Sequence, residues 1–181
     1  GGTAATKASG IYAYYNKSNV EVTGGHIDAL TYTDAGMPED AVEAYRYLLS
    51  KGYTPGQIAL CGESAGGGLC YALCQKLLQL GQPLPGGIIA ISPWADLTGS
   101  GASYTENVQK DPSLTPQMLD FYASCYATDL RDPLVSPLFG DLSKMPPSLL
   151  FAGSDELLVD DARRLHKKLL ENGRKSKQIG R

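Results

Sequence analysis

The stretch that decides the fold is Leu60-Cys61-Gly62-Glu63-Ser64-Ala65-Gly66-Gly67-Gly68-Leu69, which contains the pattern Gly-x-Ser-x-Gly. A short, mostly apolar run at 57–61 precedes it and is typical of a buried parallel strand, and helix-forming residues follow it. A serine at such a junction sits on a sharp turn that exposes its hydroxyl, and flanking glycines leave room for the backbone. Ser64 is therefore a candidate nucleophile, with the Ala65 N–H facing a developing oxyanion. The alternative is an ordinary glycine-rich turn that happens to contain a serine.

On both sides of this stretch the sequence alternates between short apolar runs and amphipathic segments. The pattern predicts strands over 57–61, 87–92 and 148–152, and helices over 38–50, 65–80, 115–126 and 160–172. Such alternation favours an α/β fold with a parallel sheet and right-handed crossovers, in one domain spanning 1–181. The segment 94–147 is too long for a simple crossover, and we expect it to form a lid or substrate wall within that domain.

Composition narrows the class of protein. The chain has 181 residues, 43% of them hydrophobic, and a net charge of −3, all ordinary for a globular protein. It has no run of eighteen or more apolar residues, so we expect no membrane span. We recognise no signal peptide and expect a cytoplasmic protein, although a first residue other than Met suggests a missing start.

No basic stripe points to nucleic acid, because the C-terminal cations fit a solvated helix face better: Arg163, Arg164, Lys167, Lys168, Arg174, Lys175 and Lys177.

The four cysteines are Cys61, Cys70, Cys74 and Cys125. They form no Cys-x-x-Cys pair and have no histidine nearby in the sequence, which argues against zinc. We expect free, buried thiols rather than a disulfide framework.

Four motifs follow one another along the chain: the serine turn at 62–67, Ser-Pro-Trp-x-Asp-Leu within 91–98, Asp-Pro-x-x-Ser-Pro within 131–138, and the acid loop at 154–160. In this order they resemble the hormone-sensitive-lipase-like esterases, a branch of the α/β-hydrolases. The resemblance runs from about Glu39 to Gly173, and Glu156 stands where the family usually has proline.

The resemblance implies an α/β-hydrolase fold, with a mostly parallel sheet flanked by helices and a cap-like excursion. It implies a serine carboxylesterase for short-chain acyl esters, with a small-molecule ester as its partner and no metal or organic cofactor. Ser64 would be the nucleophile, and Asp155 would orient a histidine. The residues agree, because Asp155 follows the strand at 148–152 and so reaches the same sheet edge as Ser64. The alternative for Asp155 is a turn or helix-capping aspartate, a role for which Asp160 or Asp161 is better placed. The sequence leaves open whether the protein forms a homo-oligomer.

The histidine of the triad has no clear place in this sequence. The family puts it after the last strand of the sheet, and this sequence stops near the start of that strand. His166 lies in the helical pattern at 160–172, where we expect a surface residue, and His26 precedes the serine in the chain. We therefore expect the base beyond Arg181 and no activity from these residues alone; the alternative is a catalytically inactive relative that binds a ligand or partner.

Both ends of the chain look incomplete by comparison with the family. Gly1 and Gly2 resemble the remnant of a His-Gly-Gly loop whose N–H groups complete the oxyanion hole; the alternative is a flexible end or cloning remnant. Residues 4–37 lack the family's Asp-Tyr-Arg-x-x-Pro element, and 27–37 show no strand pattern. Four aromatic residues are candidates for the substrate wall or, equally, for core packing: Trp94, Phe121, Tyr122 and Tyr126.

Overall fold

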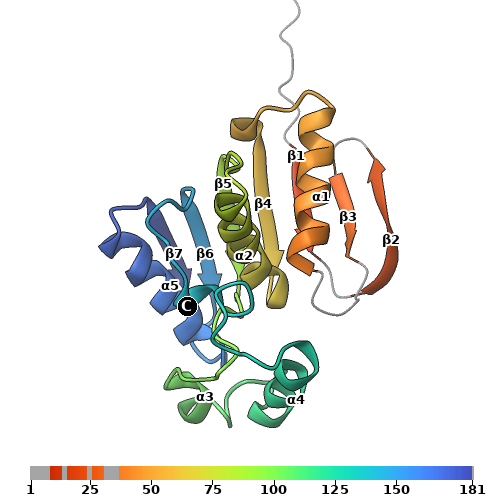
Figure 1. Cartoon of the computed structure of the whole chain (residues 1–181). Coiled ribbons are helices and arrows are strands. Elements are labelled where there is room, and N and C mark those ends of the chain that lie inside the picture. The colour runs from red at the N-terminus through yellow and green to blue at the C-terminus, as the bar shows by residue number, and fades with distance from the viewer. Residues whose placement is uncertain (1–8, 14–15, 24–25, 31–36, 181) are drawn as a thin grey trace, which may run out of the picture.

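The computed structural model of the chain describes residues 9–13, 16–23, 26–30 and 37–180, with side chains from residue 38 onward. The described residues form a seven-stranded sheet in the order β2-β3-β1-β4-β5-β6-β7 (Figure 1). Neighbouring strands are parallel except β2 and β3, which are antiparallel. The strands are β1 (Ser9–Ala13), β2 (Asn16–Thr23), β3 (His26–Leu30), β4 (Ile58–Glu63), β5 (Gly87–Ile91), β6 (Ser148–Ala152) and β7 (Ser176–Gly180).

Helices connect the parallel strands, as the alternating pattern predicts. The main connections are α1 (Met37–Ser50), α2 (Ala65–Gln79) and α5 (Val159–Glu171). The long excursion between β5 and β6 holds α3 (Ser103–Glu106), α4 (Pro116–Tyr126) and the short 3-10 helix η2 (Pro137–Phe139). Both α3 and α4 lie beyond the carboxyl ends of the strands (Figure 1). The α/β fold and its predicted strands and helices are thus confirmed, with boundaries shifted by one or two residues.

The start of β4 shows why one boundary moved. Residue 57 was expected in the strand, but Gln57 ends the 3-10 helix η1 (Pro55–Gln57). Its side-chain oxygen accepts hydrogen bonds from the Thr54 N–H and hydroxyl, both at 2.9 Å. This capping box ties Gln57 to the turn, so the strand begins one residue later.

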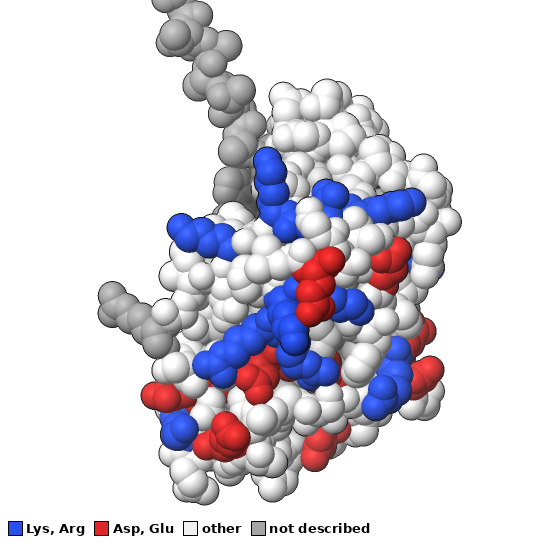
Figure 2. Space-filling model, turned by 90° about the vertical axis from the view of Figure 1, so that its left-hand side faces the viewer, with Lys and Arg blue, Asp and Glu red and all other residues white. Residues whose placement is uncertain are grey.

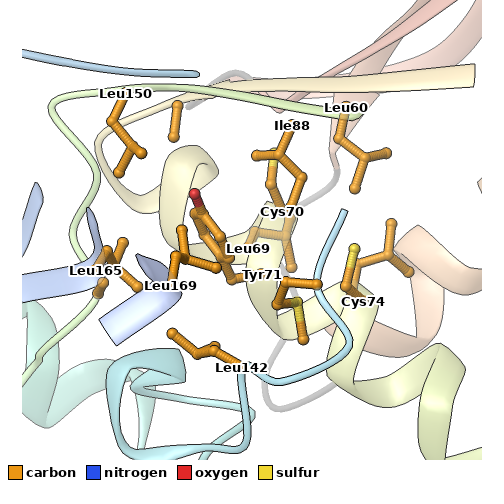
Figure 3. Close-up of a cluster of buried hydrophobic side chains, with 14 of the residues drawn as sticks. Leu60, Leu69, Cys70, Tyr71, Cys74, Ile88, Leu142, Leu150, Leu165 and Leu169 are labelled. Atoms are coloured by element: carbon orange, nitrogen blue, oxygen red, sulfur yellow. The ribbon is translucent and has the colours of Figure 1, made fainter. Parts of the chain in front are cut away.

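The core lies between the sheet and helices α1, α2 and α5 (Figure 3). Alternate residues of β4, β5 and β6 point into it, including Leu60, Ile88 and Leu150. Helix α2 is buried over most of its surface, as expected for a helix at the centre of such a sheet. The other face of the sheet is more open, with Ile91 and Ile179 exposing 38% and 41% of their surface.

The first strands correct one expectation. Residues 27–37 show no strand pattern in the sequence, yet residues 27–30 belong to β3, and β1 precedes them. A five-residue strand interrupted by Asp28 gives almost no periodicity to detect. Its identity is set instead by pairing with β1, where Gly10 faces His26 and Ile11 faces Ile27.

Most of the C-terminal lysines and arginines lie on helix α5. It buries Ala162, Leu165 and Leu169 and, apart from the buried Asp161, turns most of its charged side chains outward, as a solvated helix face does. Figure 2 shows Lys and Arg side chains gathered on this side of the molecule, with acidic side chains among them. Some of the cations have structural partners: the Lys168 ammonium donates to the Leu138 and Gly140 carbonyls, at 2.8 and 2.7 Å.

The four cysteines are free, as expected, but not all are buried. Cys70 and Cys74 lie in the core, and burial raises the pKa of the Cys70 thiol to about 12. Cys61 is half-buried because it points to the open face of β4, and Cys125 is exposed on α4.

Among the described residues, no helix combines the length and apolarity needed to cross a bilayer.

Candidate active site

Ser64 sits on a strained turn between β4 and α2. Its backbone has φ 54° and ψ −121°, in the region that favours glycine. The surrounding backbone holds it there: the Ser64 N–H donates to the Ile91 carbonyl at 2.9 Å, and the Ser64 carbonyl accepts from the N–H groups of Gly68 and Trp94, at 3.2 and 2.8 Å. A strand–turn–helix junction with a strained serine is the geometry of a nucleophile elbow.

Two glycines make this turn sterically feasible. A Cβ on Gly62 would overlap the carbonyl of Gly66, and a Cβ on Gly68 would overlap the carbonyl of Trp94. The first contact lets the chain double back after β4, and the second lets the loop after β5 lie directly against α2. Close backbone approach therefore accounts for Gly62 of the motif and for Gly68 just after it.

Ala65 is the first residue of α2 and is half-buried. The first N–H groups of a helix have no partner within it, and they lie at the positive end of its dipole. The Ala65 N–H is thus placed to meet negative charge on an atom bonded to Ser64. Gly1 and Gly2, the other predicted oxyanion donors, lie outside the described residues.

The strand register brings the predicted acid to the same edge of the sheet. Glu63 pairs with Ile91 and Ile91 with Phe151, so β4, β5 and β6 end nearly level. Ser64 directly follows β4, and Asp155 lies three residues beyond the end of β6. Asp155 is exposed, and neither its carboxylate nor the Ser64 hydroxyl has a hydrogen-bond partner among the described residues.

Both histidines of the chain lie toward the opposite edge. His26 begins β3 and, through Gly10 of β1, is level with Ala59 near the start of β4. The Nδ1 atom of His166 lies 2.8 Å from the hydroxyl of Ser176, the first residue of β7. His166 is therefore a helix residue near the surface, as predicted, and the register argues against His26 as the base for Ser64.

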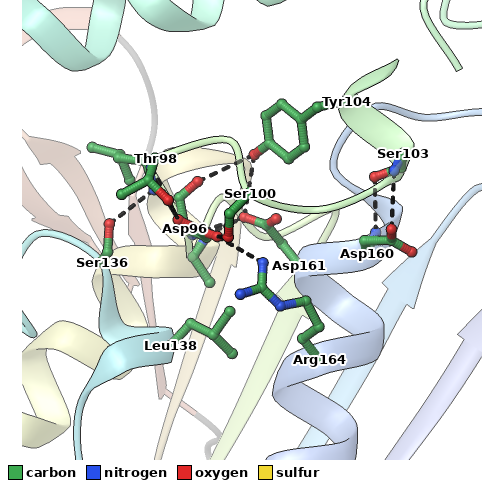
Figure 4. Close-up of polar contacts among 12 residues, drawn as sticks. Asp96, Thr98, Ser100, Ser103, Tyr104, Ser136, Leu138, Asp160, Asp161 and Arg164 are labelled. Carbon is green, nitrogen blue, oxygen red and sulfur yellow. Dashed lines mark hydrogen bonds and ion pairs between the residues drawn. The ribbon is translucent and has the colours of Figure 1, made fainter. Parts of the chain in front are cut away.

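A buried polar network joins the loop after β5 to α5 (Figure 4). One carboxylate oxygen of Asp161 accepts from the N–H groups of Ala95 and Asp96, both at 2.8 Å. The Asp96 carboxylate accepts from Thr98 and Ser100 and pairs with Arg164 at 2.6 Å. These residues belong to two of the resembling motifs or lie next to them, which gives the motifs a structural reason to occur together.

A third motif joins the same loop. The Leu97 N–H donates to the Ser136 hydroxyl at 2.8 Å, and the Leu138 N–H donates to the Ala95 carbonyl at 3.1 Å. Two segments far apart in the sequence, 136–138 and 161–164, thus fix the loop whose Trp94 N–H binds the Ser64 carbonyl. The roles of Asp161, Arg164 and Ser136 in this network were not predicted from the sequence. The only signal was that Ser136 and Asp160, the neighbour of Asp161, lie in recognised motifs.

The two carboxylates of this network differ in protonation. Burial raises the pKa of Asp161 to about 7, against the opposing effect of the Ala95 and Asp96 N–H groups. Burial also acts to raise the pKa of Asp96, but hydrogen bonds from Ser100 and Thr98 and the pairing with Arg164 outweigh it and leave the pKa lowered. Asp96 therefore carries the charge that balances Arg164.

The start of α5 corrects the expectation that Asp160 or Asp161 caps the helix. The N-cap residue is Leu158, with no side-chain cap. Asp161 serves the loop after β5 instead, and Asp160 accepts from the Ser103 N–H at 2.9 Å and pairs with Arg163. Neither aspartate caps the helix, because the excursion packs against this end of α5 and its N–H groups donate to both carboxylates. The local sequence does not reveal this packing.

The predicted wall residues lie in different environments. Trp94 is buried at 7% exposure in a second apolar cluster, and Ala65, Tyr122 and Tyr126 pack against that cluster. Phe121 is 63% exposed on α4. Trp94 therefore packs behind the elbow, whereas Phe121 faces outward.

A cavity of about 450 Å³ opens between the start of α1 and the end of α4. Tyr126 lines it, together with apolar and acidic side chains of the following loop; Ser64 does not line it. The lining residues are Pro38, Glu39, Ser124, Cys125, Tyr126, Ala127, Thr128, Asp129, Asp132, Leu134 and Val135.

Comparison with known proteins agrees with this geometry. A family model described as alpha/beta hydrolase fold matches residues 35–179. An acetyl-hydrolase of Streptomyces hygroscopicus is 47% identical over 137 residues, which are 75% of this chain and 46% of that protein. An esterase of Acinetobacter venetianus is 38% identical over 149 residues, 79% of this chain and 49% of that protein. The chain thus spans about half the length of the curated relatives it matches.

Solved structures show the same relationship. An esterase from the bacterial hormone-sensitive lipase family superimposes with a TM-score of 0.81 at 38% identity, covering 86% of this chain and 54% of that one. EstE5 superimposes with a TM-score of 0.84 at 30% identity, covering 95% of this chain and 66% of that one. Motifs, strand order, elbow geometry and relatives agree, and the chain belongs to the α/β-hydrolase fold family, on its hormone-sensitive-lipase-like branch.

Proposed function

We propose that the protein is a serine carboxylesterase that acts on short-chain acyl esters. The observation that carries the proposal is the strained Ser64 at the carboxyl edge of the sheet, with its hydroxyl free of other partners among the described residues. The names of two relatives, acetyl-hydrolase and esterase, support the choice of esters and of a short acyl group.

In the proposed reaction, the Ser64 hydroxyl attacks the ester carbonyl and gives its proton to a histidine. The Ala65 N–H, with N–H groups from a glycine loop that includes Gly1 and Gly2, stabilises the tetrahedral oxyanion; one such donor contributes about 3 kcal/mol. The alcohol leaves with the proton from the histidine. Water then attacks the acyl-enzyme and releases the acid, and Asp155 orients the histidine throughout.

We place the histidine outside residues 1–181, in the full-length protein. The support is the position of the two histidines of this chain, which lie toward the sheet edge opposite Ser64. Residues 1–181 expressed alone should therefore show no ester turnover. Turnover by this segment would contradict the placement of the base, and His26→Ala would then show whether His26 takes that role.

The test is reaction of the full-length protein with a fluorophosphonate probe and hydrolysis of p-nitrophenyl acetate. We expect labelling at Ser64, and Ser64→Ala should abolish it and lower kcat/KM by at least about 10⁴-fold. Ser92→Ala is the matched control, because Ser92 also follows a strand with positive φ, at 45°. An unlabelled but folded protein would overturn the esterase proposal in favour of a ligand-binding relative. Faster turnover of an anilide than of the ester would indicate an amidase.

A further inference from the structure

The loop that carries Asp155 is held by side chains of the excursion. It joins β6 to α5 at residues 153–158, and its backbone bonds to Asn107, Asp111 and Ser103. Gly153 and Glu156 add two bonds within the loop itself: the Gly153 N–H donates to the Glu156 carboxylate at 2.9 Å, and the Glu156 N–H donates to the Gly153 carbonyl at 3.3 Å. Glu156 is the residue that stands where the family usually has proline. The acid loop therefore takes much of its shape from a distant segment.

Asn107 makes the most direct contact. Its Nδ2 amide group donates to the carbonyls of Ser154 and Glu156, at 3.0 and 2.9 Å, so it bonds to the backbone on both sides of Asp155. The Lys110 ammonium donates to Asn107 Oδ1 at 3.0 Å, which directs the amide hydrogens toward the loop. Asn107 is only 5% exposed, so water does not readily replace these bonds.

Asp111 and Ser103 hold the next residue of the loop. The Leu157 N–H donates to Asp111 Oδ2 at 2.8 Å, and the Ser103 hydroxyl donates to the Leu157 carbonyl. Burial acts to raise the pKa of Asp111, but the N–H groups of Leu157, Leu114 and Ser113 outweigh it and keep the pKa low. Asp111 is therefore charged at neutral pH, and charge strengthens its hydrogen bond to the loop.

We propose that Asn107, supported by Asp111, is a positioning residue that sets where the Asp155 carboxylate stands relative to the catalytic histidine. The inference rests on the proposed function, since it assigns Asn107 a part in the same reaction. The excursion, expected from the sequence to form a lid or substrate wall, then also orients the acid.

Displacing the acid has a characteristic signature. A carboxylate beside an imidazole stabilises the imidazolium, so it raises the pKa of the histidine. If the loop relaxes and Asp155 moves away, the pKa of the base falls and its orientation loosens. Loss of substrate binding alone would change neither property.

The test uses Asn107→Asp in the full-length protein. The new carboxylate cannot donate to the Ser154 and Glu156 carbonyls, and it repels them, while the size of the side chain is kept. We expect kcat on p-nitrophenyl acetate to fall about 10²-fold, as for a misplacement of about 1 Å, with KM changed less than about twofold. The acidic limb of the kcat/KM profile should move to lower pH.

Asn172→Asp is the matched control, because Asn172 Nδ2 makes one exposed bond, to the Lys168 carbonyl at the end of α5. It should leave kcat and the pH profile unchanged. If Asn107→Asp does not fold, Asp111→Asn replaces it. An asparagine has one acceptor oxygen, so it cannot accept from Leu157 and also from Ser113 and Leu114 as the two carboxylate oxygens do, and we expect the pH limb to shift in the same direction.

The outcomes separate the two proposals. An active wild type whose Asn107→Asp and Asp111→Asn variants keep kcat and the pH limb would overturn the positioning role and leave the esterase intact. A rise in KM with unchanged kcat would also overturn it, since it would assign these residues to substrate binding. A wild-type protein that is neither labelled by the fluorophosphonate probe nor active on p-nitrophenyl acetate would contradict the proposed function itself.

Discussion

The serine and the acid stand at one edge of the sheet but are held there in different ways. Ser64 is fixed by backbone contacts, with Gly62 of its motif and Gly68 just after the motif permitting the close approach. The backbone around Asp155 is fixed by side chains that lie 46 to 49 residues earlier in the chain. Both positions depend on tertiary packing, but the nucleophile turn also needs glycines next to it in the sequence and so has a recognisable local motif, whereas the side chains that hold the acid loop have none.

We expect the largest loss of stability where helix α2 packs against the loop after β5, beside Ser64. Gly68→Ala places a Cβ on the Trp94 carbonyl, so α2 and the loop after β5 must separate. We expect the free energy of unfolding to fall by about 4 kcal/mol, in the range of exceptional single substitutions. Urea unfolding measures this. Gly56→Ala is the control, because its Cβ would meet no atom within 4 Å; equal values for both variants would contradict the role of close approach.

The next prediction concerns the buried contact of Asp161, on α5, with the loop after β5. Asp161→Ala leaves the buried N–H groups of Ala95 and Asp96 without an acceptor, and we expect a loss of about 3 kcal/mol in thermal or urea unfolding. Asp160→Ala is the control at the neighbouring, partly exposed position. If the two variants lose equal stability, burial of the Asp161 network is not what holds the loop.

The pH dependence of stability gives a second test of the buried Asp161 carboxylate. The pKa of Asp161 in the folded protein is about 7, above the value of about 4 for an unfolded aspartate. The folded state therefore binds more protons than the unfolded state between these values, and this contribution to stability is lost as pH rises from about 4 to about 7. Asp161→Asn should remove that slope. A wild type and variant whose stabilities run parallel across this range would contradict the raised pKa.

The smallest effect compares two adjacent arginines of α5. Arg164 pairs with the fully buried Asp96, so Arg164→Ala should cost about 1.5 kcal/mol, because the other hydrogen bonds to Asp96 remain. Arg163 pairs with Asp160 at the surface, and Arg163→Ala should cost less than about 0.5 kcal/mol. Chemical denaturation of both variants measures the difference. The reverse order would place the main contribution at the surface.

The same contrast explains what could be predicted from sequence. The elbow, the strands β4, β5 and β6 and the helices α2 and α5 have strong local patterns, and the structure contains them nearly as predicted. The strand β3 was missed because its pairing partners, rather than its own five residues, determine it. Asp161 was expected at a helix cap and serves a distant loop instead. The roles of Asn107 and Asp111 have no local signature, because their partners lie beyond the excursion in the sequence.

The Asp161 carboxylate has a consequence for local motion. Ala95 and Asp96 lie in a loop, where amide hydrogens usually exchange quickly with solvent, yet both residues are 0% exposed and both N–H groups bind Asp161. Their hydrogens can exchange only when α5 separates from the loop, so they should be protected nearly as long as the amides of the central strands. We therefore expect the loop that contacts Ser64 to open together with the core of the domain.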